Sequence, residues 1–200
     1  MDAKTQKAEL TRAAIIGAGI DLAASDGLEA ITLQAVAARI GLSKSGVFSR
    51  VGSREALQKA VIEEFGRQFI ADVFVPAMQA PKGLPRLNEI AQRWITRVRD
   101  VEAQTGCIYS AGAFELDDRE GPLRDTLHDE ITRWRAALRR SVLQAIEAGH
   151  LKADTDPAQV VSELNALILG LLHDTRFLRE SRAAERAQAT WQRLLDSYKS

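Results

Sequence analysis

Apolar residues recur along most of the chain at the three- and four-residue spacing of an amphipathic helix, and the alternating pattern of strands is nearly absent. The pattern predicts an all-α protein with nine helices, at residues 7–25, 33–40, 44–51, 54–75, 86–104, 107–115, 122–148, 157–179 and 182–198. Three prolines and a glycine predict a loop over residues 76–85. Gly17 and Gly19 lie inside the first predicted helix, where each glycine destabilises the helix by about 1 kcal/mol relative to alanine. Close packing on neighbouring helices would compensate for this cost.

The second and third predicted helices have the features of a helix-turn-helix. Ala37 is small enough for a tight crossing of the two helices, and Gly41 tolerates the positive φ of the turn between them. Thr32, Ser43 and Ser53 precede the second, third and fourth helices as N-caps. The residues with the spacing to fill the shared core are Val36, Ile40, Leu42 and Val47.

The charge distribution is consistent with a nucleic-acid interface at this motif. Lys+Arg and Asp+Glu balance at 27 each over the chain, whereas the segment from Arg39 to Lys59 has a net charge of +4. The second helix of such a motif enters the major groove, and a capped helix N-terminus can bind a phosphate. The predicted DNA-binding residues are Thr32, Gln34, Ser43, Lys44, Ser45, Gly46, Phe48, Ser49, Arg50, Ser53 and Arg54.

The chain from Ile15 to Leu57 resembles the tetracycline-repressor (TetR) family of bacterial transcriptional regulators. The likeness includes the Gly27 stop, the Thr32-capped helix, Val36-Ala37, Gly41-Leu42-Ser43-Lys44-Ser45-Gly46 and Gly52-Ser53-Arg54-Glu55-Ala56-Leu57. More loosely, Thr105-Gly106-Cys107 and the run from Phe114 to Pro122 resemble one subgroup of the family. Two positions depart from it, because Phe48 stands where a phosphate-contacting tyrosine is usual and Val51 where an aromatic residue is usual.

The resemblance implies a homodimer whose two helix-turn-helix domains bind the half-sites of a palindromic operator in double-stranded DNA. Half-sites about 34–36 Å apart are the minimal geometry for such a dimer. It further implies a helix-turn-helix domain at residues 1–52 and a helical effector-binding and dimerisation domain at residues 53–200. A small-molecule effector would enter the second domain, shift the fourth helix and release a repressor from DNA, although activation stays open.

Apolar stripes in the last two helices predict the dimer interface, and burial within one domain is the alternative. Its residues are Val161, Leu164, Ile168, Leu172, Ala187, Trp191, Leu194, Leu195 and Tyr198. The candidates to line an effector pocket are Trp94, Val98, Cys107, Tyr109, Phe114, Trp134, Leu138, Leu167 and Leu171, each of which is otherwise ordinary core. They suit a small, largely apolar effector. Cys107 is either a redox-sensitive thiol or, more in keeping with its surroundings, an inert buried cysteine.

Other classes of function have little support in the sequence. We expect no catalytic residue and no cofactor, because the Gly-rich phosphate loop, G-x-S-x-G and HExxH motifs are absent. The three histidines lack ligand spacing, so we expect no metal site. With one cysteine and no membrane-spanning stretch, we expect a cytoplasmic protein that does not bind membranes. A helical interaction protein and a small enzyme without a DNA-binding role remain the alternatives.

Overall fold

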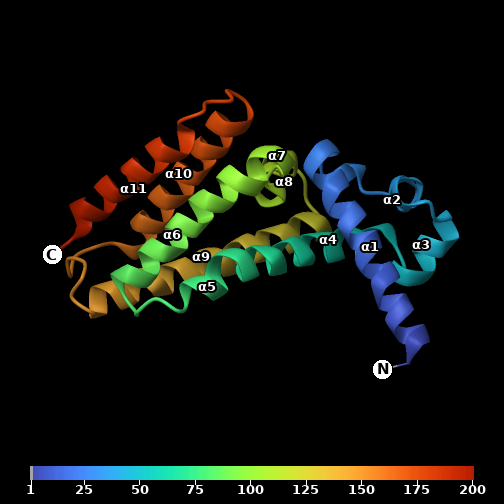
Figure 1. Cartoon of the computed structure of the whole chain (residues 1–200), viewed down its shortest axis with the longest axis horizontal. Helices are drawn as coiled ribbons and strands as arrows, with labels where there is room; N and C mark the ends of the chain where they lie inside the picture. The colour runs from blue at the N-terminus through green and yellow to red at the C-terminus, as the bar shows by residue number, and fades with distance from the viewer. Residues whose placement is uncertain (1) are drawn as a thin grey trace. The chain divides into compact units, whose positions relative to one another are not determined.

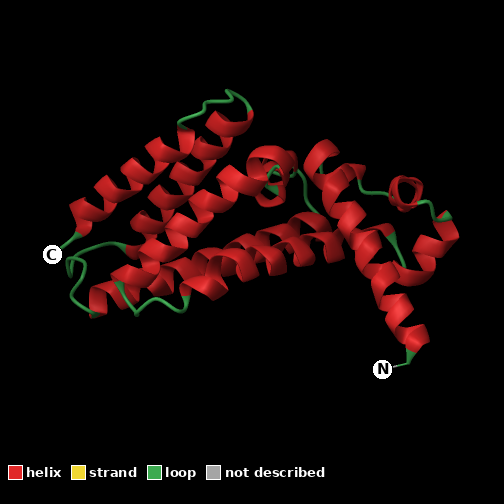
Figure 2. Cartoon of the chain, viewed as in Figure 1, coloured by secondary structure: helices red, strands yellow, loops and turns green. Residues whose placement is uncertain are grey.

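A computed structural model describes residues 2–200, and their regular structure is helical apart from one isolated bridge between Leu151 and Lys199 (Figures 1 and 2). The α-helices are α1 (Ala3–Asp26), α2 (Leu33–Ile40), α3 (Lys44–Val51), α4 (Arg54–Phe69), α5 (Val75–Ala77), α6 (Leu84–Arg97), α7 (Ala103–Thr105), α8 (Ile108–Glu115), α9 (Pro122–Glu147), α10 (Pro157–Arg176) and α11 (Ala183–Tyr198). A 3₁₀ turn, η1 (Leu28–Ala30), and two π-helical turns, η2 (Ile70–Phe74) and η3 (Val98–Glu102), complete them. The predicted all-α fold is confirmed.

The helices form two compact units that do not follow the order of the chain. The first unit contains the residues up to Arg67 together with Cys107–Glu130, and the second contains Gln68–Gly106 and Ile131–Ser200. The segment Cys107–Glu130 therefore packs with the helix-turn-helix region rather than with its neighbours in sequence. The predicted boundary between a DNA-binding domain (residues 1–52) and an effector-binding domain (residues 53–200) divides the chain by function, whereas these units are defined by contacts. That boundary stays a prediction.

The first unit is built around α1, which packs on α2, α3 and α8. Ile15, Ile31 and Leu57 are among the fully buried residues of its core. The two glycines of α1 differ: a Cβ added at Gly19 would lie 2.5 Å from Cγ2 of Val61, whereas one at Gly17 would meet nothing within 4 Å. Close packing therefore accounts for Gly19 and not for Gly17.

The second unit is held together by contacts of α6, α10 and α11 (Figure 1). Trp191 of α11 is 1% exposed, and its indole N–H donates to Oδ1 of Asn88 on α6 at 3.1 Å. Fully burying an aromatic side chain of this size stabilises a fold by several kcal/mol, on the order of 3–5 kcal/mol relative to alanine. Trp191 therefore ties α11 to α6 inside this core.

The helix boundaries around the predicted loop at residues 76–85 need correction. The chain remains helical through η2 and α5 as far as Ala77, and α6 begins at Leu84 with Pro85 in its first turn. Proline is tolerated in a first helical turn because the N–H it lacks would have no partner there. Pro76 follows directly on the π-helical turn η2, and the helix continues for one residue beyond it to Ala77.

Candidate functional site

The helix-turn-helix has the local geometry that its sequence predicts. Gly41 ends α2 in the left-handed conformation, with φ 67°. Oγ1 of Thr32 accepts a hydrogen bond from the backbone N–H of Ala35, and Oγ of Ser43 accepts one from Gly46, both at 3.0 Å. These caps fix where α2 and α3 begin, and the turn at Gly41 fixes how one follows the other.

The two helices share a small core. Of the four residues predicted to fill it, Val36 and Val47 are buried and Ile40 is half-buried, and Ala37 at the crossing is buried too. Leu42 is 39% exposed, so its predicted place in that core is wrong. It directly follows the Gly41 turn, where the chain runs along the surface.

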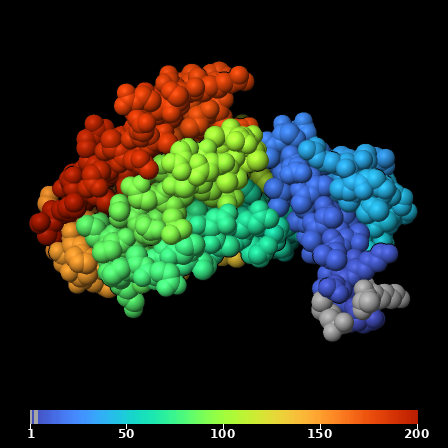
Figure 3. Space-filling view, in the orientation of Figure 1, coloured from blue at the N-terminus to red at the C-terminus, as the bar shows by residue number. Residues whose placement is uncertain are grey.

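Most of the predicted DNA-binding residues lie on the accessible surface of α2 and α3, which Figure 3 shows in light blue. Phe48 is 56% exposed although it is aromatic, so its ring is available to a partner. The other exposed members are Gln34, Ser43, Lys44, Ser45, Ser49 and Arg50, whereas Thr32, Gly46, Ser53 and Arg54 are half-buried. Contact of these residues with DNA stays a prediction.

The positive charge of this region is concentrated on α3. Three of its five cations face carboxylates, in the pairs Arg39–Asp21 at 3.9 Å, Arg54–Glu29 at 3.4 Å and Lys59–Glu63 at 3.8 Å. Lys44 and Arg50, both on α3, have no ion pair among residues 2–200. Unneutralised cations on the helix expected to enter the major groove are what a phosphate backbone would attract.

The start of α4 is occupied by contacts within the chain. Oγ of Ser53 accepts from the N–H of Ala56 at 3.0 Å, and its hydrogen bond with Glu55 lowers the pKa of that carboxyl. Arg54 donates to the carbonyl oxygens of Ile31 at 3.1 Å and Glu29 at 2.6 Å. Arg54 therefore links α4 to the segment before α2, a structural role that the sequence reasoning missed.

The predicted pocket residues are divided between the two units. Trp94, Val98, Trp134, Leu138 and Leu171 are buried in the second unit, with Leu167 half-buried there. In the first unit, Cys107 and Tyr109 are buried and Phe114 is 69% exposed. The tyrosine hydroxyl donates to Oε2 of Glu130 at 3.3 Å. The burial of Cys107 agrees with the inert alternative.

Four aromatic rings form a cluster in the second unit. Phe69 contacts Trp94 and Trp134 edge-to-face, with ring centroids 5.4 and 4.6 Å away, and the two indoles are 5.3 Å apart. Phe74 packs on Trp134 at 6.0 Å. The indole N–H groups of Trp94 and Trp134 are buried without a hydrogen-bond partner among the described residues. Each such orphan donor costs about 1–3 kcal/mol, so two in one cluster require an explanation.

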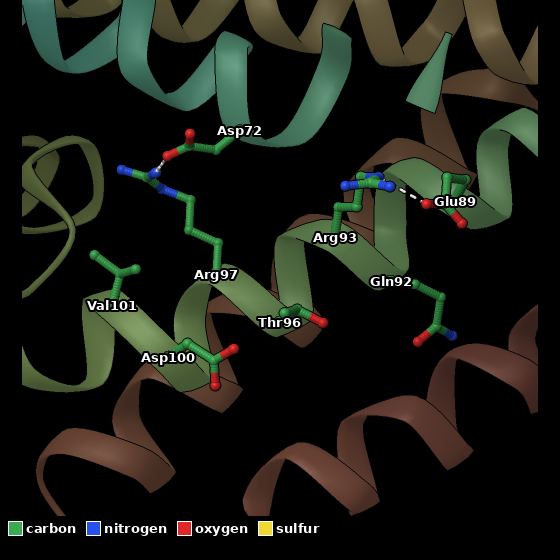
Figure 4. Close-up of a pocket in the computed structure, with 8 residues that line it drawn as sticks. All are labelled: Asp72, Glu89, Gln92, Arg93, Thr96, Arg97, Asp100 and Val101. Atoms are coloured by element: carbon green, nitrogen blue, oxygen red, sulfur yellow. Dashed lines mark hydrogen bonds and ion pairs between the residues drawn. The ribbon is translucent and has the colours of Figure 1, made fainter. Parts of the chain in front are cut away.

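A pocket of about 530 Å³ lies beside this cluster on η2, α6 and η3 (Figure 4). It is lined by Asp72, Glu89, Gln92, Arg93, Thr96, Arg97, Asp100 and Val101. Arg97 forms ion pairs with Asp72 and Glu102 and lies 5.8 Å from the Phe69 ring centroid, while Arg93 pairs with Glu89 at 2.7 Å.

None of the nine predicted pocket residues lines this hollow. The four-residue spacing of Glu89, Arg93 and Arg97 on one helix face was the available signal for it. The carboxylate of Glu102 is fully buried, and nothing in its sequence context predicts that.

The predicted dimer residues are mostly buried in the chain's own core. Seven of the nine are buried, namely Val161, Leu164, Ile168, Leu172, Ala187, Trp191 and Leu195. Leu194 and Tyr198 are half-buried. The Tyr198 hydroxyl donates to Oε2 of Glu163 at 2.8 Å, and burial together with that carboxylate raises the pKa of the tyrosine to about 12. The seven buried residues favour the alternative of burial within one chain, and the interface itself stays a prediction.

Two further features concern residues 2–200 as a whole. No group of three or more histidine, cysteine or acidic side chains is placed there to hold a metal ion. No helix in that part of the chain is long and apolar enough to cross a membrane.

Comparison with known proteins gives the family. Residues 83–191, more than half of the chain, match the model of the tetracyclin repressor-like C-terminal domain. A TetR-family regulator from Chloroflexus aurantiacus J-10-FL is 19% identical, with a TM-score of 0.85 over 97% of this chain and 98% of that one. One from Cytophaga hutchinsonii is also 19% identical, with a TM-score of 0.80 over 96% of each chain.

A third structure, of a protein solved to explain how bacterial hormones control antibiotic production, is 27% identical, with a TM-score of 0.70 over 95% of this chain and 98% of that one. No curated protein matches the sequence. The helix-turn-helix geometry, the all-α fold and the match of the C-terminal region agree with one another. The chain belongs to the tetracyclin repressor-like (TetR) family of DNA-binding transcriptional regulators.

Proposed function

We propose that this regulator is a cytoplasmic homodimeric repressor, which binds a palindromic operator through α2 and α3 and is released by a small-molecule effector. The observation that carries the proposal is the accessible face of α3, where Lys44 and Arg50 are exposed and have no ion pair among the described residues. The family makes a helical interaction protein or a small enzyme the weaker alternatives.

The residues of α3 suit entry into a major groove. Ser43, Ser45 and Ser49 are short and polar, so they allow close approach of the helix to base edges. Lys44 supplies a charge near the helix N-terminus for phosphate or base. Phe48 offers an apolar contact to sugar or a thymine methyl in place of the hydroxyl that a tyrosine would bring.

For the dimer, we place the contact on accessible positions of α10 and α11, which Figure 3 shows as an orange and red surface. Ala166 and Gly170 of α10 are exposed, and a Cβ added at Gly170 would meet nothing within 4 Å. Leu167, Leu194 and Tyr198 are half-buried and would be covered by the partner. Two such helix pairs related by a two-fold axis form a self-complementary interface.

For the effector, we place the site in the second unit, near Phe69. The orphan N–H groups of Trp94 and Trp134 favour a molecule that carries oxygen acceptors on an otherwise apolar body. The adjoining pocket, where Arg97 lies over Phe69, is lined mainly by polar and charged residues and suits a more polar end of the same molecule. The structure of the 27% identical protein concerns the control of antibiotic production by bacterial hormones. This likeness supports a small signal molecule as the effector of the present regulator.

Operator binding tests the proposal directly. The protein is offered random duplex DNA, the selected site is examined for two-fold symmetry, and affinity is measured against salt. We expect a palindrome and a steep loss of affinity with salt. Lys44→Ala should weaken binding by about 5- to 150-fold, in line with about 1–3 kcal/mol for a recognition contact. Lys59→Ala, whose lysine already pairs with Glu63, is the matched control and should bind nearly as wild type does.

A failure to select any site at low salt contradicts the repressor. Equal binding by Lys44→Ala and wild type contradicts the recognition surface. The dimer has its own test: Gly170→Arg should give folded monomers in sedimentation, while Ala136→Arg, at an exposed position of α9, should leave the dimer intact. A dimer that survives Gly170→Arg places the interface elsewhere.

A further inference from the structure

The run from Phe114 to Pro122 includes a carboxylate that binds the backbone just before the helix-turn-helix. Oε2 of Glu115 accepts a hydrogen bond from the N–H of Leu28, and Oε1 accepts one from the N–H of Glu29, both at 2.8 Å. All three residues belong to the first unit. Charge-assisted bonds of this kind are about twice as strong as neutral ones. The C-terminal end of α8 is therefore tied to the segment between α1 and α2.

Glycines make this close approach possible on both sides. Gly27 has φ 91°, and a Cβ added there would lie 2.9 Å from Oε2 of Glu115. A Cβ added at Gly112 of α8 would lie 2.5 Å from Cδ1 of Leu28. Larger residues at either position would push α8 away from the segment, so the contact depends on both glycines.

The same segment is also held from α4 and from the loop after α8. The side-chain amide of Gln58, which is buried, donates to the carbonyl of Leu28 at 3.1 Å. Arg54 donates to the carbonyls of Glu29 and Ile31, and Arg119 pairs with the Glu29 carboxylate at 3.6 Å. The held residues 28–31 lead directly into Thr32, the N-cap of α2.

We propose that Glu115 is a positioning residue, which couples the position of α8 to the arrangement of α2 and α3 that binds DNA. The inference rests on the proposed function, and it identifies a contact that would regulate operator binding. Displacing α8 from residues 28–29 breaks two charge-assisted hydrogen bonds and frees the entry to α2. Operator affinity then falls in proportion to the fraction of molecules whose α2 and α3 keep the binding arrangement.

The chemistry of the side chain defines the test. Two backbone N–H donors need two acceptor oxygens, and a carboxylate supplies both. In Glu115→Gln the side chain keeps its shape, but its NH₂ group faces one of the donors. Glu120→Gln makes the same chemical change at an exposed position of the same run and is the matched control.

We expect Glu115→Gln to bind the selected operator roughly tenfold more weakly than wild type, and Glu120→Gln to bind as wild type does. The slope of log affinity against log salt should stay unchanged, because the phosphate contacts of α3 are intact. Hydrogen exchange on the DNA-free protein should speed up at Leu28 and Glu29 and leave the α3 amides as they were. Glu115→Asp, which keeps both oxygens on a shorter stem, should recover part of the affinity.

Equal operator affinity of the two glutamine variants overturns the proposal. So does faster exchange spread evenly over the first unit with a lowered unfolding midpoint, since that marks a general structural role. The exchange experiment needs no DNA, so it tests the Glu115 contact even if the wild-type protein selects no operator. That last result would contradict the repressor and leave the contact to be judged by exchange alone.

Discussion

The helix-turn-helix and the second unit are both helical, but they are specified by interactions of different range. In the first, Thr32, Gly41 and Ser43 fix helix ends through bonds to residues three or four positions away. In the second, Trp191 bonds Asn88 across more than a hundred residues of chain. Short-range interactions can be read from a sequence directly, whereas long-range ones depend on how the helices pack.

The two regions also differ in how they use arginine and lysine. Lys44 and Arg50 on α3 face solvent with no ion pair among the described residues. Arg97, in the second unit, is 7% exposed and bonds the carboxylates of Asp72 and Glu102. Exposed cations are available to a polyanion, while a buried one must be neutralised by its own chain. Charge therefore serves recognition in one region and packing in the other.

The strongest test of this comparison is Trp191→Ala. If α11 belongs to the core of the second unit, the change should destabilise the protein by about 3–5 kcal/mol, because it removes a fully buried indole. Trp191→Phe, which keeps most of the apolar volume and loses the bond to Asn88, should cost clearly less. Denaturant unfolding followed by circular dichroism measures both. Monomers with unchanged stability would show instead that Trp191 lies between subunits.

These contrasts explain how far the sequence could predict the molecule. The caps at Thr32, Ser43 and Ser53 and the turn at Gly41 were predicted correctly, because each acts within one helical turn. Leu42 was placed in the core wrongly, because the spacing of apolar residues does not show which of them stays on the surface at a turn.

The non-local features could not be predicted in the same way. An apolar stripe is equally consistent with a core and with an interface, so the burial of Trp191 and Leu195 within one chain required the packing of α6 and α10. The pocket candidates were chosen as aromatic and apolar residues, whereas the pocket described above is lined mainly by charged and polar residues around Arg97. Glu115 belonged to a run that the resemblance singled out, but its bond partners lie 86 and 87 residues away.

The glycines of α1 test whether the first unit also depends on long-range packing. Gly19→Ala should destabilise it by about 1–3 kcal/mol, because the new methyl group overlaps Val61. Gly17→Ala should stabilise it by up to about 1 kcal/mol, because alanine favours the helix and nothing obstructs it. Thermal unfolding of the two variants gives the signs. A change in stability of the same sign in both variants would show that close packing does not distinguish Gly19 from Gly17.

A smaller effect should follow from restoring the tyrosine that the family resemblance places at the position of Phe48. Phe48→Tyr adds a hydroxyl to a ring that is 56% exposed on α3, and we take about 0.5–1.5 kcal/mol, the net value of an ordinary hydrogen bond, for its solvent-exposed contact with a phosphate. We expect operator affinity to rise between about twofold and tenfold. Phe114→Tyr, at an exposed position on α8, is the control. A rise in operator affinity in both variants would contradict a phosphate contact specific to α3.

The smallest effect concerns alkaline stability of the second unit. The folded pKa of Tyr198 is raised to about 12, first by burial and then by the bond to Glu163, above the unfolded value of 10.0. Its contribution is therefore complete below pH 10.0 and is lost as pH rises towards about 12. Tyr198→Phe should flatten the fall of the unfolding midpoint across that window. Because the hydroxyl is partly accessible, the difference should be small, and an unchanged slope would mean that Tyr198 and Glu163 separate in solution.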